Sequence, residues 1–281
     1  MTRKKIMIEG AMELETELLT ASLEQPREAV FGSWRFIEGI YKDIPLVVAV
    51  TSIGAANAAA ATVLGIEHFQ PAAIINQGTA GGHDPHLHAF DIVLGQKSFD
   101  ASSYRTAKED KADWQHMELM GAFAYDQHTR TFMSQAVYCS GDGKILAAAH
   151  EAAAGYTRGC VVDGCIASCN TWNRQKERLL YLHETFGSSC EEMEVHSAAL
   201  ICQQYHIPFL GIRIISNTEF QDEEFQPDAA KMCQQFVLDV VQHRNNKSLW
   251  NAAVQRLLWV RQSHLSRCDI PSKGFGQAVR F

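Results

Sequence analysis

The amino-acid sequence predicts an α/β fold with three layers, in which a central mixed β-sheet is flanked by helices. Short apolar runs alternate with helical segments along the 281 residues, and this alternation is typical of a layered fold with a largely parallel sheet. No internal repeat or low-complexity linker divides the chain before a basic segment at its end. We therefore expect one domain over residues 1–243, followed by a C-terminal extension over residues 244–281.

Strands are predicted where apolar and β-branched residues run between turn residues. Ser33–Tyr41 and Ile44–Val50 are separated by Lys42-Asp43, which predicts a tight turn. Ala73–Asn76 is a buried run that leads into Gly78–Gly82, which we interpret as a glycine turn. The other predicted strands are Lys5–Ile8, Asp91–Gly95, Gln135–Cys139, Gly159–Asp163 and Pro208–Ser216.

Helices are predicted from composition and from their end signals. A first helix begins within Gly10–Glu15, where acids in its first turn suit the helix dipole. Ala55–His68 is rich in alanine, which allows close packing on a sheet, and Pro71 ends it. The other predicted helices are Gly143–Ala154, Arg174–Phe186, Glu194–Tyr205 and Asp228–His243. The polar stretch Ser98–Met133 is expected to carry long loops.

Composition excludes several classes of protein. The net charge of −7 gives no general electrostatic case for binding nucleic acid. The basic start Arg3-Lys4-Lys5 is not followed by an apolar segment long enough for a signal peptide, and no apolar run approaches the length of a membrane span. The eight cysteines are scattered without a C-x-x-C pair, which indicates reduced thiols in a cytoplasmic protein. Cys165 and Cys169 lack a matching second half of a metal site, so we expect them to be small buried residues.

The C-terminal extension differs from the rest of the chain. From Arg244 onward it is strongly basic, with Asp269 as its one acid, and Trp250, Leu257 and Leu258 indicate an amphipathic helix. We interpret it as a helix docked on the domain or on a partner subunit. The alternative is a contact with RNA or a membrane surface.

Polar residues follow several apolar strands at their carboxyl ends, where α/β sheets bind ligands. They include two or three carboxylates, small hydroxyls and one amide: Glu13, Ser52, Thr79, Ser216, Asn217 and the acids of Glu192-Met193-Glu194. The glycine-rich stretch Gly78–Gly82 contains no basic residue and matches neither a P-loop nor a dinucleotide fingerprint. Carboxylates with few cations suit a neutral ligand rich in hydroxyls, such as a ribose.

Three stretches then resemble the purine nucleoside phosphorylase superfamily, and within it the methylthioadenosine/S-adenosylhomocysteine nucleosidases. They are IMIEGAMELETELL (residues 6–19), TSIGAANAAAATVLGIEHFQPAAIINQGTAGG (residues 51–82) and EEMEVHSAALICQQYHIPFLGIRIISN (residues 191–217), with DIV (residues 91–93) between them. The resemblance implies the hydrolysis of the N-glycosidic bond of a purine nucleoside or 5′-thionucleoside. It also implies a homodimer, a role in methionine salvage and no cofactor or metal.

The resemblance assigns roles to individual residues. Glu13 matches the glutamate that activates the attacking water, and Arg213 matches an arginine that orients this glutamate. Glu194 matches the acid that holds the ribose hydroxyls. Asn217 stands where the family has the aspartate that protonates N7 of the leaving purine. The residues expected to bind the nucleoside are Met12, Ile53, Thr79, Glu192, Met193, Glu194 and Ser216. For Glu192, stabilisation of the helix start is the alternative.

The choice between water and phosphate as the nucleophile depends on whether the site contains cationic side chains that could bind phosphate. No phosphate-binding arginine occurs around Gly78–Gly82, which favours water as the nucleophile over phosphate. Arg105 is the candidate phosphate ligand elsewhere in the chain, so phosphorolysis of a 6-oxopurine nucleoside is the alternative reaction.

Asn217 is the main departure from the family pattern, because an amide cannot deliver a proton to N7. Three explanations remain open: a base such as hypoxanthine or guanine, a proton supplied by Glu219 or Asp222, or a protein that binds a nucleoside with little turnover. The aromatic residue expected to stack on the base is also displaced, and Trp172 either stacks on the base or packs in the core. The histidines His83, His86 and His88 have spacing that suits a metal, but we expect a surface loop or a subunit contact.

Overall fold

The computed structural model describes residues 5–106, 108, 117–126, 128–134 and 136–245. Apart from Arg244 and Asn245, the expected C-terminal extension lies outside these residues, as do Arg3 and Lys4 of the basic start. In this part of the chain, no helix is both long and apolar enough to cross a membrane.

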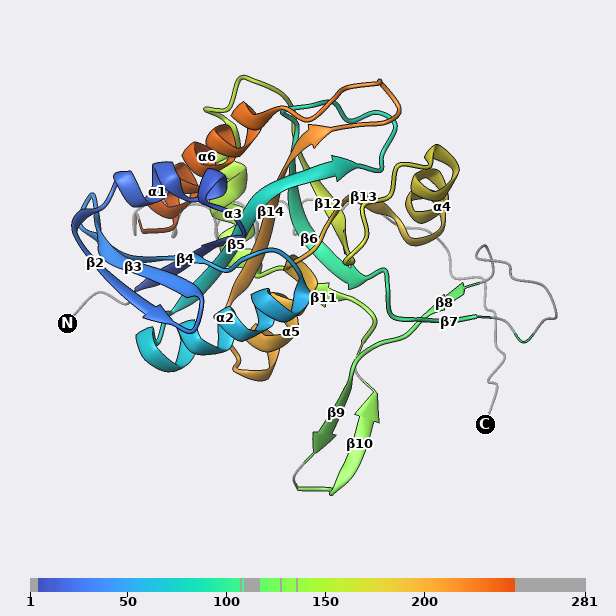
Figure 1. Cartoon of the computed structure of the whole chain (residues 1–281), viewed down its shortest axis with the longest axis horizontal. Coiled ribbons are helices and arrows are strands. Elements are labelled where there is room, and N and C mark those ends of the chain that lie inside the picture. Colours follow the sequence, from blue (N-terminus) through green and yellow to red (C-terminus); the bar gives the residue numbers. More distant parts are fainter. Residues whose placement is uncertain (1–4, 107, 109–116, 127, 135, 246–281) are drawn as a thin grey trace, which may run out of the picture. The chain divides into compact units, whose positions relative to one another are not determined.

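A mixed sheet of ten strands forms the centre of the fold, as predicted (Figure 1). Along its main path the order is β11 (Cys139–Ser140), β6 (Ile92–Asp100), β12 (Val161–Ser168), β13 (Ser188–Glu192), β5 (Ala73–Gly82), β1 (Ile6–Gly10), β4 (Ile44–Val50), β3 (Trp34–Tyr41) and β2 (Glu24–Phe31). β14 (Phe209–Asn217) pairs in parallel with β5 and antiparallel with β6.

Five of these strands form a closed circuit of pairing. β5 pairs with β14, β14 with β6, β6 with β12, β12 with β13, and β13 returns to β5. The contact between β13 and β5 is confined to the carboxyl end of β5, where Glu191 pairs with Gly81 and Cys190 with Gly82. The circuit therefore brings the ends of three strands, β5, β13 and β14, together at one point.

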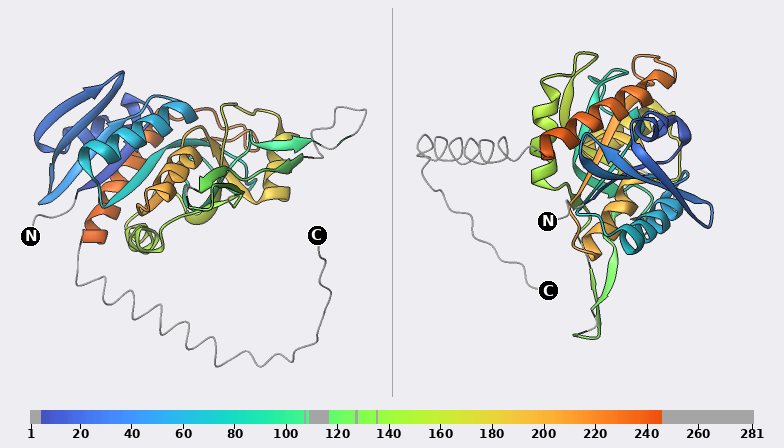
Figure 2. Two further views of the ribbon diagram at one scale, coloured as in Figure 1. Left: turned by 90° about the horizontal axis from the view of Figure 1, so that it is seen from below. Right: turned by 90° about the vertical axis from the view of Figure 1, so that its left-hand side faces the viewer.

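Helices cover both faces of the sheet, which gives the predicted three layers (Figure 2). The helices α1 (Glu17–Ala21), α3 (Gly143–Ala153) and α6 (Pro227–Asn245) pack on one face, and α2 (Ala55–Phe69) and α5 (Val195–Gln204) pack on the other. The strands alternate between the two cores, as β1 shows: Ile6 and Ile8 face the first group of helices and Met7 faces the second. A further helix, α4 (Lys176–Phe186), precedes β13.

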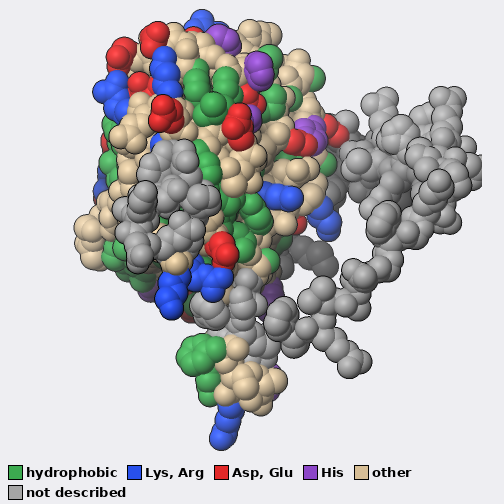
Figure 3. Space-filling view, turned by 90° about the vertical axis from the view of Figure 1, so that its right-hand side faces the viewer, with side chains coloured by type: hydrophobic (Ala, Val, Ile, Leu, Met, Phe, Trp, Pro, Cys, Tyr) green, Lys and Arg blue, Asp and Glu red, His purple; other side chains and the backbone are tan. Residues whose placement is uncertain are grey.

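The expected loop region Ser98–Met133 contains short strands instead. β7 (Tyr104–Thr106) pairs with β8 (Met117–Leu119), and β9 (Phe123–Asp126) pairs with β10 (Thr131–Ser134). The β9–β10 hairpin extends away from the sheet at the bottom of Figures 1 and 3. Tyr125 and Phe132 pack against each other across this hairpin with 5.2 Å between ring centroids, and 74% of Phe132 is exposed.

Two expectations near the strand ends were wrong. The glycine-rich stretch Gly78–Gly82 is not a turn, because β5 continues through it to Gly82. Glu191 and Glu192 do not begin a helix, since they end the fully buried strand β13, and α5 starts only at Val195. The strand β13 reads SSCEE and lacks the apolar signal of the other strands, so its pattern gave no indication of a strand.

Candidate active site

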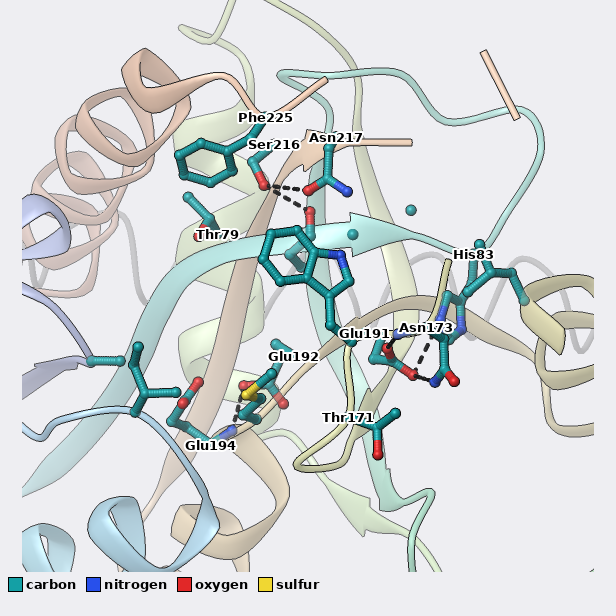
Figure 4. Close-up of a pocket in the computed structure, with 18 of the residues that line it drawn as sticks. Thr79, His83, Thr171, Asn173, Glu191, Glu192, Glu194, Ser216, Asn217 and Phe225 are labelled. Atoms are coloured by element: carbon teal, nitrogen blue, oxygen red, sulfur yellow. Dashed lines mark hydrogen bonds and ion pairs between the residues drawn. The ribbon is translucent and has the colours of Figure 1, made fainter. Parts of the chain in front are cut away.

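A cavity of about 330 Å³ lies where the carboxyl ends of β5, β13 and β14 meet (Figure 4). Its lining comes from these strand ends, from the segments after β1, β4 and β14, and from α4 with the loop before it. Carboxylates, hydroxyls, two amides and a histidine line it together with apolar side chains. None of the described residues that line it is lysine or arginine.

Glu15, at the end of the short 3₁₀-helix η1 (Glu13–Glu15), supplies a buried carboxylate to this cavity. One oxygen, Oε1, accepts hydrogen bonds from the backbone N–H of Thr79 at 2.9 Å and from its hydroxyl at 3.0 Å. The other, Oε2, accepts from the N–H of Ala11 at 2.9 Å. Gly78 makes this approach possible, because a Cβ there would lie 2.6 Å from Oε1. The carboxylate is thus fixed against the end of β5.

Glu13, the residue expected to activate water, lies outside the cavity. Its side chain is 60% exposed and pairs with Arg35 at 2.9 Å. The physical reason is that residues two apart on a helical turn point to different sides, and η1 turns Glu15 towards the end of β5. The expectation for Glu13 is therefore wrong, and Glu15, two residues later in the same motif, takes the position it was expected to hold.

Glu194 and Glu192 form a buried acidic pair beside the cavity, held by Arg213. Glu192 Oε2 lies 2.6 Å from Arg213 Nη2, and Glu194 Oε2 lies 3.6 Å from the same nitrogen. Glu192 also accepts from the N–H groups of Glu194 and Val195 at 2.8 and 2.9 Å. Its oxygens are therefore occupied at the start of α5, which was the structural alternative for this residue. Glu194 Oε1 accepts only the N–H of Gly54, at 2.7 Å, among the hydrogen bonds of the described residues.

Burial and the neighbouring charge of Glu192 raise the pKa of Glu194 to about 8, although Arg213 lowers it. Arg213 itself is fully buried on β14 and contacts Glu192 and Glu194 but not Glu13. The expectation that Arg213 orients the first glutamate is wrong for this reason. It contacts the acidic pair instead.

A further buried carboxyl group, Glu9, is linked to this pair through Asn76 and Arg213. Asn76 donates its Nδ2 to Glu9 at 2.9 Å and accepts from Arg213 Nη2 at 2.7 Å through Oδ1, and Thr62 donates its hydroxyl to Glu9 at 2.8 Å. Burial raises the pKa of Glu9 to about 7, although the hydrogen bonds from Asn76 and Thr62 and the charge of Arg213 lower it.

The raised pKa of Glu9 predicts how stability depends on pH. Between its ordinary value of 4.5 and about 7, the folded protein holds a proton that the unfolded chain has released. The stabilisation is complete below the lower value and is lost as pH rises through about 7. Replacing Glu9 by Gln should raise the free energy of unfolding at pH 8 by about 1–3 kcal/mol and reduce its slope between pH 6 and 7.5. Denaturant titrations at these pH values test this, and an unchanged slope would contradict it.

The end of β14 supplies a hydroxyl and an amide to the cavity. Ser216 Oγ lies 2.9 Å from Asn217 Oδ1 and 3.2 Å from the carbonyl oxygen of Ala80 (Figure 4). Trp172 lines the same part of the cavity with 62% of its surface exposed, so it does not pack in the core. An exposed indole at the wall of a cavity is free to stack on a flat ligand.

Glu191 and His83 also line this part of the cavity, and sequence reasoning missed both as site residues. His83 was expected in a surface loop, but it is fully buried, and its Nδ1 lies 2.8 Å from Ser188 Oγ. Its Nε2 lies 3.6 Å from Glu191 Oε2, while Asn173 donates its backbone N–H to Glu191 Oε1 at 3.0 Å (Figure 4). For Glu191, the adjacent carboxylates of residues 191 and 192 were the signal in the sequence, and for His83 the signal was its spacing to His86 and His88.

The remaining expected residues divide between the cavity and the surface. Met12, Ile53, Thr79 and Met193 line the cavity, as expected of binding residues. Arg105 pairs with Glu118 on the exposed β7–β8 ribbon, outside the cavity lining. Of the two alternative proton donors, Glu219 lines the cavity and Asp222 does not.

The described histidines and cysteines form no metal site. No group of three or more His, Cys, Asp or Glu side chains is placed to hold a metal ion in the described part of the chain. His88 pairs with Glu223 at 3.1 Å, away from His83. The cysteines that the structure describes are free, and Cys165 and Cys169 are buried.

Comparison with known proteins agrees with this architecture. A family model described as the phosphorylase superfamily matches residues 5–242. The chain belongs to the phosphorylase superfamily.

Within the phosphorylase superfamily, the chain is similar to curated 5′-methylthioadenosine/S-adenosylhomocysteine nucleosidases. That of Bacillus licheniformis is 28% identical over 248 residues, which cover 86% of this chain and 100% of the relative. That of Shewanella pealeana is 31% identical over 219 residues, which cover 78% of this chain and 88% of the relative.

Solved structures of the phosphorylase superfamily share the fold. The Neisseria meningitidis 5′-methylthioadenosine/S-adenosylhomocysteine nucleosidase, in complex with methylthio-immucillin-A, superposes with a TM-score of 0.70 and 28% identity over 85% of this chain and 98% of that one. The futalosine hydrolase of Helicobacter pylori has a TM-score of 0.69 at 24% identity, over 85% of this chain and 97% of that one, and shares the fold.

Proposed function

We propose that the chain is a purine nucleosidase, which hydrolyses the N-glycosidic bond of a purine nucleoside or 5′-thionucleoside to a free purine and a ribose derivative. The observation that carries the proposal is the fixed, buried carboxylate of Glu15 in a cavity that it shares with Glu194, Trp172 and Asn217. These groups supply what the reaction needs: a base for water, an acceptor for ribose hydroxyls, a stacking surface and a donor to the base. The similarity to curated nucleosidases supports the same reaction class.

In the mechanism that this arrangement supports, Glu15 removes a proton from water as its oxygen bonds to C1′. The C1′–N9 bond breaks, and its electron pair leaves with the purine, which takes up a proton from solvent. The sugar gains oxocarbenium character, which the ionised carboxylates of Glu15 and Glu194 stabilise. Glu194 accepts hydrogen bonds from the ribose hydroxyls, and the Asn217 amide donates to the charge that develops on the base. Met12, Ile53 and Met193 offer apolar surface to the sugar and its 5′-substituent.

The cavity lining favours water over phosphate as the nucleophile. A phosphate site usually holds lysine or arginine beside backbone N–H groups, and the described lining holds neither. Arg105, the candidate phosphate ligand, is paired with Glu118 on the surface.

The proposal has further parts that follow from the resemblance. We assign the activity to residues 1–243 and treat residues 244–281 as a separate basic extension. We place the protein in the cytoplasm as a homodimer, with a role in methionine salvage, and we expect no cofactor. Sedimentation of the full chain tests the oligomeric state.

Product analysis by chromatography tests the function. The full chain is incubated with methylthioadenosine, S-adenosylhomocysteine, adenosine, inosine and guanosine, each with and without phosphate. We expect free base and a free ribose derivative in the absence of phosphate. Cleavage only with phosphate would make the protein a phosphorylase, and stabilisation by a nucleoside without any product would make it a binding protein.

The raised pKa of Glu194 predicts a dependence of activity on pH. Below a pKa of about 8 this carboxyl group is mostly protonated, and it then cannot accept from two ribose hydroxyls or stabilise a positive sugar. We expect kcat/KM to rise with pH and to level off above about 8. Burial is the main cause of the raised pKa of Glu194, and replacing Glu192 by Gln removes the neighbouring charge that adds to it, so the rise of kcat/KM should move to lower pH. A kcat/KM profile that is flat from about pH 6 to 9 would contradict the assignment.

A further inference from the structure

Glu9 is a buried carboxyl group of β1 that lies outside the cavity lining, yet hydrogen bonds connect it to the acidic pair. It stands beside Asn76 of β5, whose Nδ2 lies 2.9 Å from Glu9 Oε2. Asn76 Oδ1 in turn lies 2.7 Å from Arg213 Nη2. The same nitrogen lies 2.6 Å from Glu192 and 3.6 Å from Glu194. The guanidinium is therefore shared between the link to Glu9 and the two carboxyl groups beside the cavity.

The direction of these hydrogen bonds is fixed by Arg213, which can only donate. Asn76 must therefore turn its oxygen towards Arg213 and its NH₂ group towards Glu9. A charge on Glu9 reaches the guanidinium through this amide. An ionised Glu9 binds the NH₂ group more strongly, which makes the Asn76 oxygen a better acceptor for Arg213.

The other oxygen of Glu9 lies where a proton on it would be well placed. Thr62 Oγ lies 2.8 Å from Glu9 Oε1 and 2.7 Å from the carbonyl oxygen of Ala58, but it carries a single proton. When Glu9 is protonated, it donates to Thr62, and Thr62 donates to Ala58. When Glu9 is ionised, Thr62 must donate to it, and the carbonyl of Ala58 loses that bond. The geometry thus accommodates the neutral form, in agreement with the pKa of about 7 that burial gives Glu9.

Arg213 and Cys202 are the charged or titratable groups that act on Glu9 among the described residues. On its other side, β4 places an alanine beside it. Burial raises the pKa of the Cys202 thiol, so this group of α5 is neutral. Ionisation of Glu9 therefore adds a third buried carboxylate to Glu192 and Glu194 around one arginine. Each added negative charge makes it harder for Glu194 to lose its proton.

We propose that Glu9 is a positioning residue for the hydrolysis, which sets through Arg213 how readily Glu194 ionises and therefore the pH at which the site becomes active. A neutral Glu9 leaves the guanidinium to the acidic pair. As pH rises, Glu9 ionises before Glu194 and draws on Arg213, which moves the ionisation of Glu194 to higher pH. The inference rests on the proposed function, since Glu194 is there the acceptor for the ribose hydroxyls and stabilises the positive sugar.

Replacing Glu9 by Gln imitates the neutral acid, because the amide accepts from Asn76 and donates to Thr62. We expect the rise of kcat/KM with pH to move to lower pH by about half a unit to one unit. Thr62→Val keeps the shape of the side chain but removes the donor to ionised Glu9, so it should move the rise in the same direction by less. Glu17→Gln, the same exchange on the exposed surface of α1, is the control and should leave the profile unchanged.

Carbon NMR follows the same coupling without turnover. The protein is labelled with ¹³C at the glutamate side-chain carboxyl, and Glu194→Gln identifies the resonance of Glu194 by its loss. We expect this resonance to titrate at lower pH in Glu9→Gln than in the wild-type protein, by about the same amount as the kinetic profile. A merely structural role of Glu9 would change stability, or kcat at every pH, and would leave both midpoints in place.

An unchanged midpoint of the Glu194 titration in a folded Glu9→Gln protein would overturn the inference, as would a kinetic profile that does not move. If both proteins still hydrolyse a nucleoside without phosphate, the proposed function then stands without it. If the Glu194 resonance moves as expected and no nucleoside is cleaved under any condition, the coupling holds and the proposed function fails.

Discussion

Replacing Glu15 by glutamine is expected to lower kcat for nucleoside hydrolysis by about 10²–10⁴-fold, the usual contribution of a general base. Glutamine keeps the shape of the side chain and can still accept from Thr79, but it cannot take a proton from water. Its NH₂ group would face the N–H of Ala11, which donates to Oε2 in the wild-type protein, so the melting temperature should also fall while the fold is kept. Steady-state kinetics on the preferred nucleoside, with thermal melting alongside, measures both effects.

Glu13→Gln is the matched control, two residues away in the same short helix. Glu13 is exposed and pairs with Arg35, so this exchange should leave kcat within about twofold, since it removes only a surface ion pair. The opposite result, in which Glu13→Gln inactivates the protein and Glu15→Gln does not, would restore the expectation from the sequence and refute the site as described.

Replacing Asn217 by Asp is expected to raise kcat/KM for adenine nucleosides by about 10²–10⁴-fold, because a carboxyl group can deliver a proton to N7 as the base departs. The same exchange should lower kcat/KM for 6-oxopurine nucleosides, since an ionised carboxylate repels O6. The two changes together would shift the base preference of the site towards adenine. Initial rates of the variant and the wild-type protein on inosine and adenosine, measured over a range of pH, test both changes in kcat/KM.

An asparagine outside the cavity provides the comparison for this variant. Asn245→Asp, at the end of α6, makes the same chemical change and should alter neither rate. Unchanged adenosine cleavage in a folded Asn217→Asp protein would mean that residue 217 does not set the choice of base. Another group, with Glu219 the nearest candidate by its place in the cavity lining, would then act on N7.

Most of the fold could be predicted from the sequence, because the hydrophobic pattern is strong where strands are buried on both faces. Strands β1, β4 and β14 and helices α2, α3 and α5 lie close to their predicted ranges. β13 was missed because its burial rests on polar residues and on pairing with β5 and β12, which are distant in the chain. Pattern reasoning detects local periodicity, and this strand has none.

The site was predictable as a region but not in every residue. Met193 and Glu194 lie between β13 and α5, Thr79 and Asn217 lie near the carboxyl ends of β5 and β14, and these strand ends converge as expected. The choice between Glu13 and Glu15 depended on which side of the short helix faces the end of β5, which a motif does not specify. His83 and Glu191 come from opposite sides of a strand pairing, so only the closed circuit of strands brings them together.

The central claim is hydrolysis of the N-glycosidic bond, and incorporation of solvent oxygen into the released ribose tests it most directly. The protein is incubated in H₂¹⁸O without phosphate with inosine and, separately, with adenosine, and the products are analysed by mass spectrometry at early times. Free ribose kept in the same water corrects for spontaneous exchange. The account predicts one ¹⁸O atom in each ribose released and none in the purine. Ribose without label beyond that control, or cleavage that appears only when phosphate is added, would contradict it.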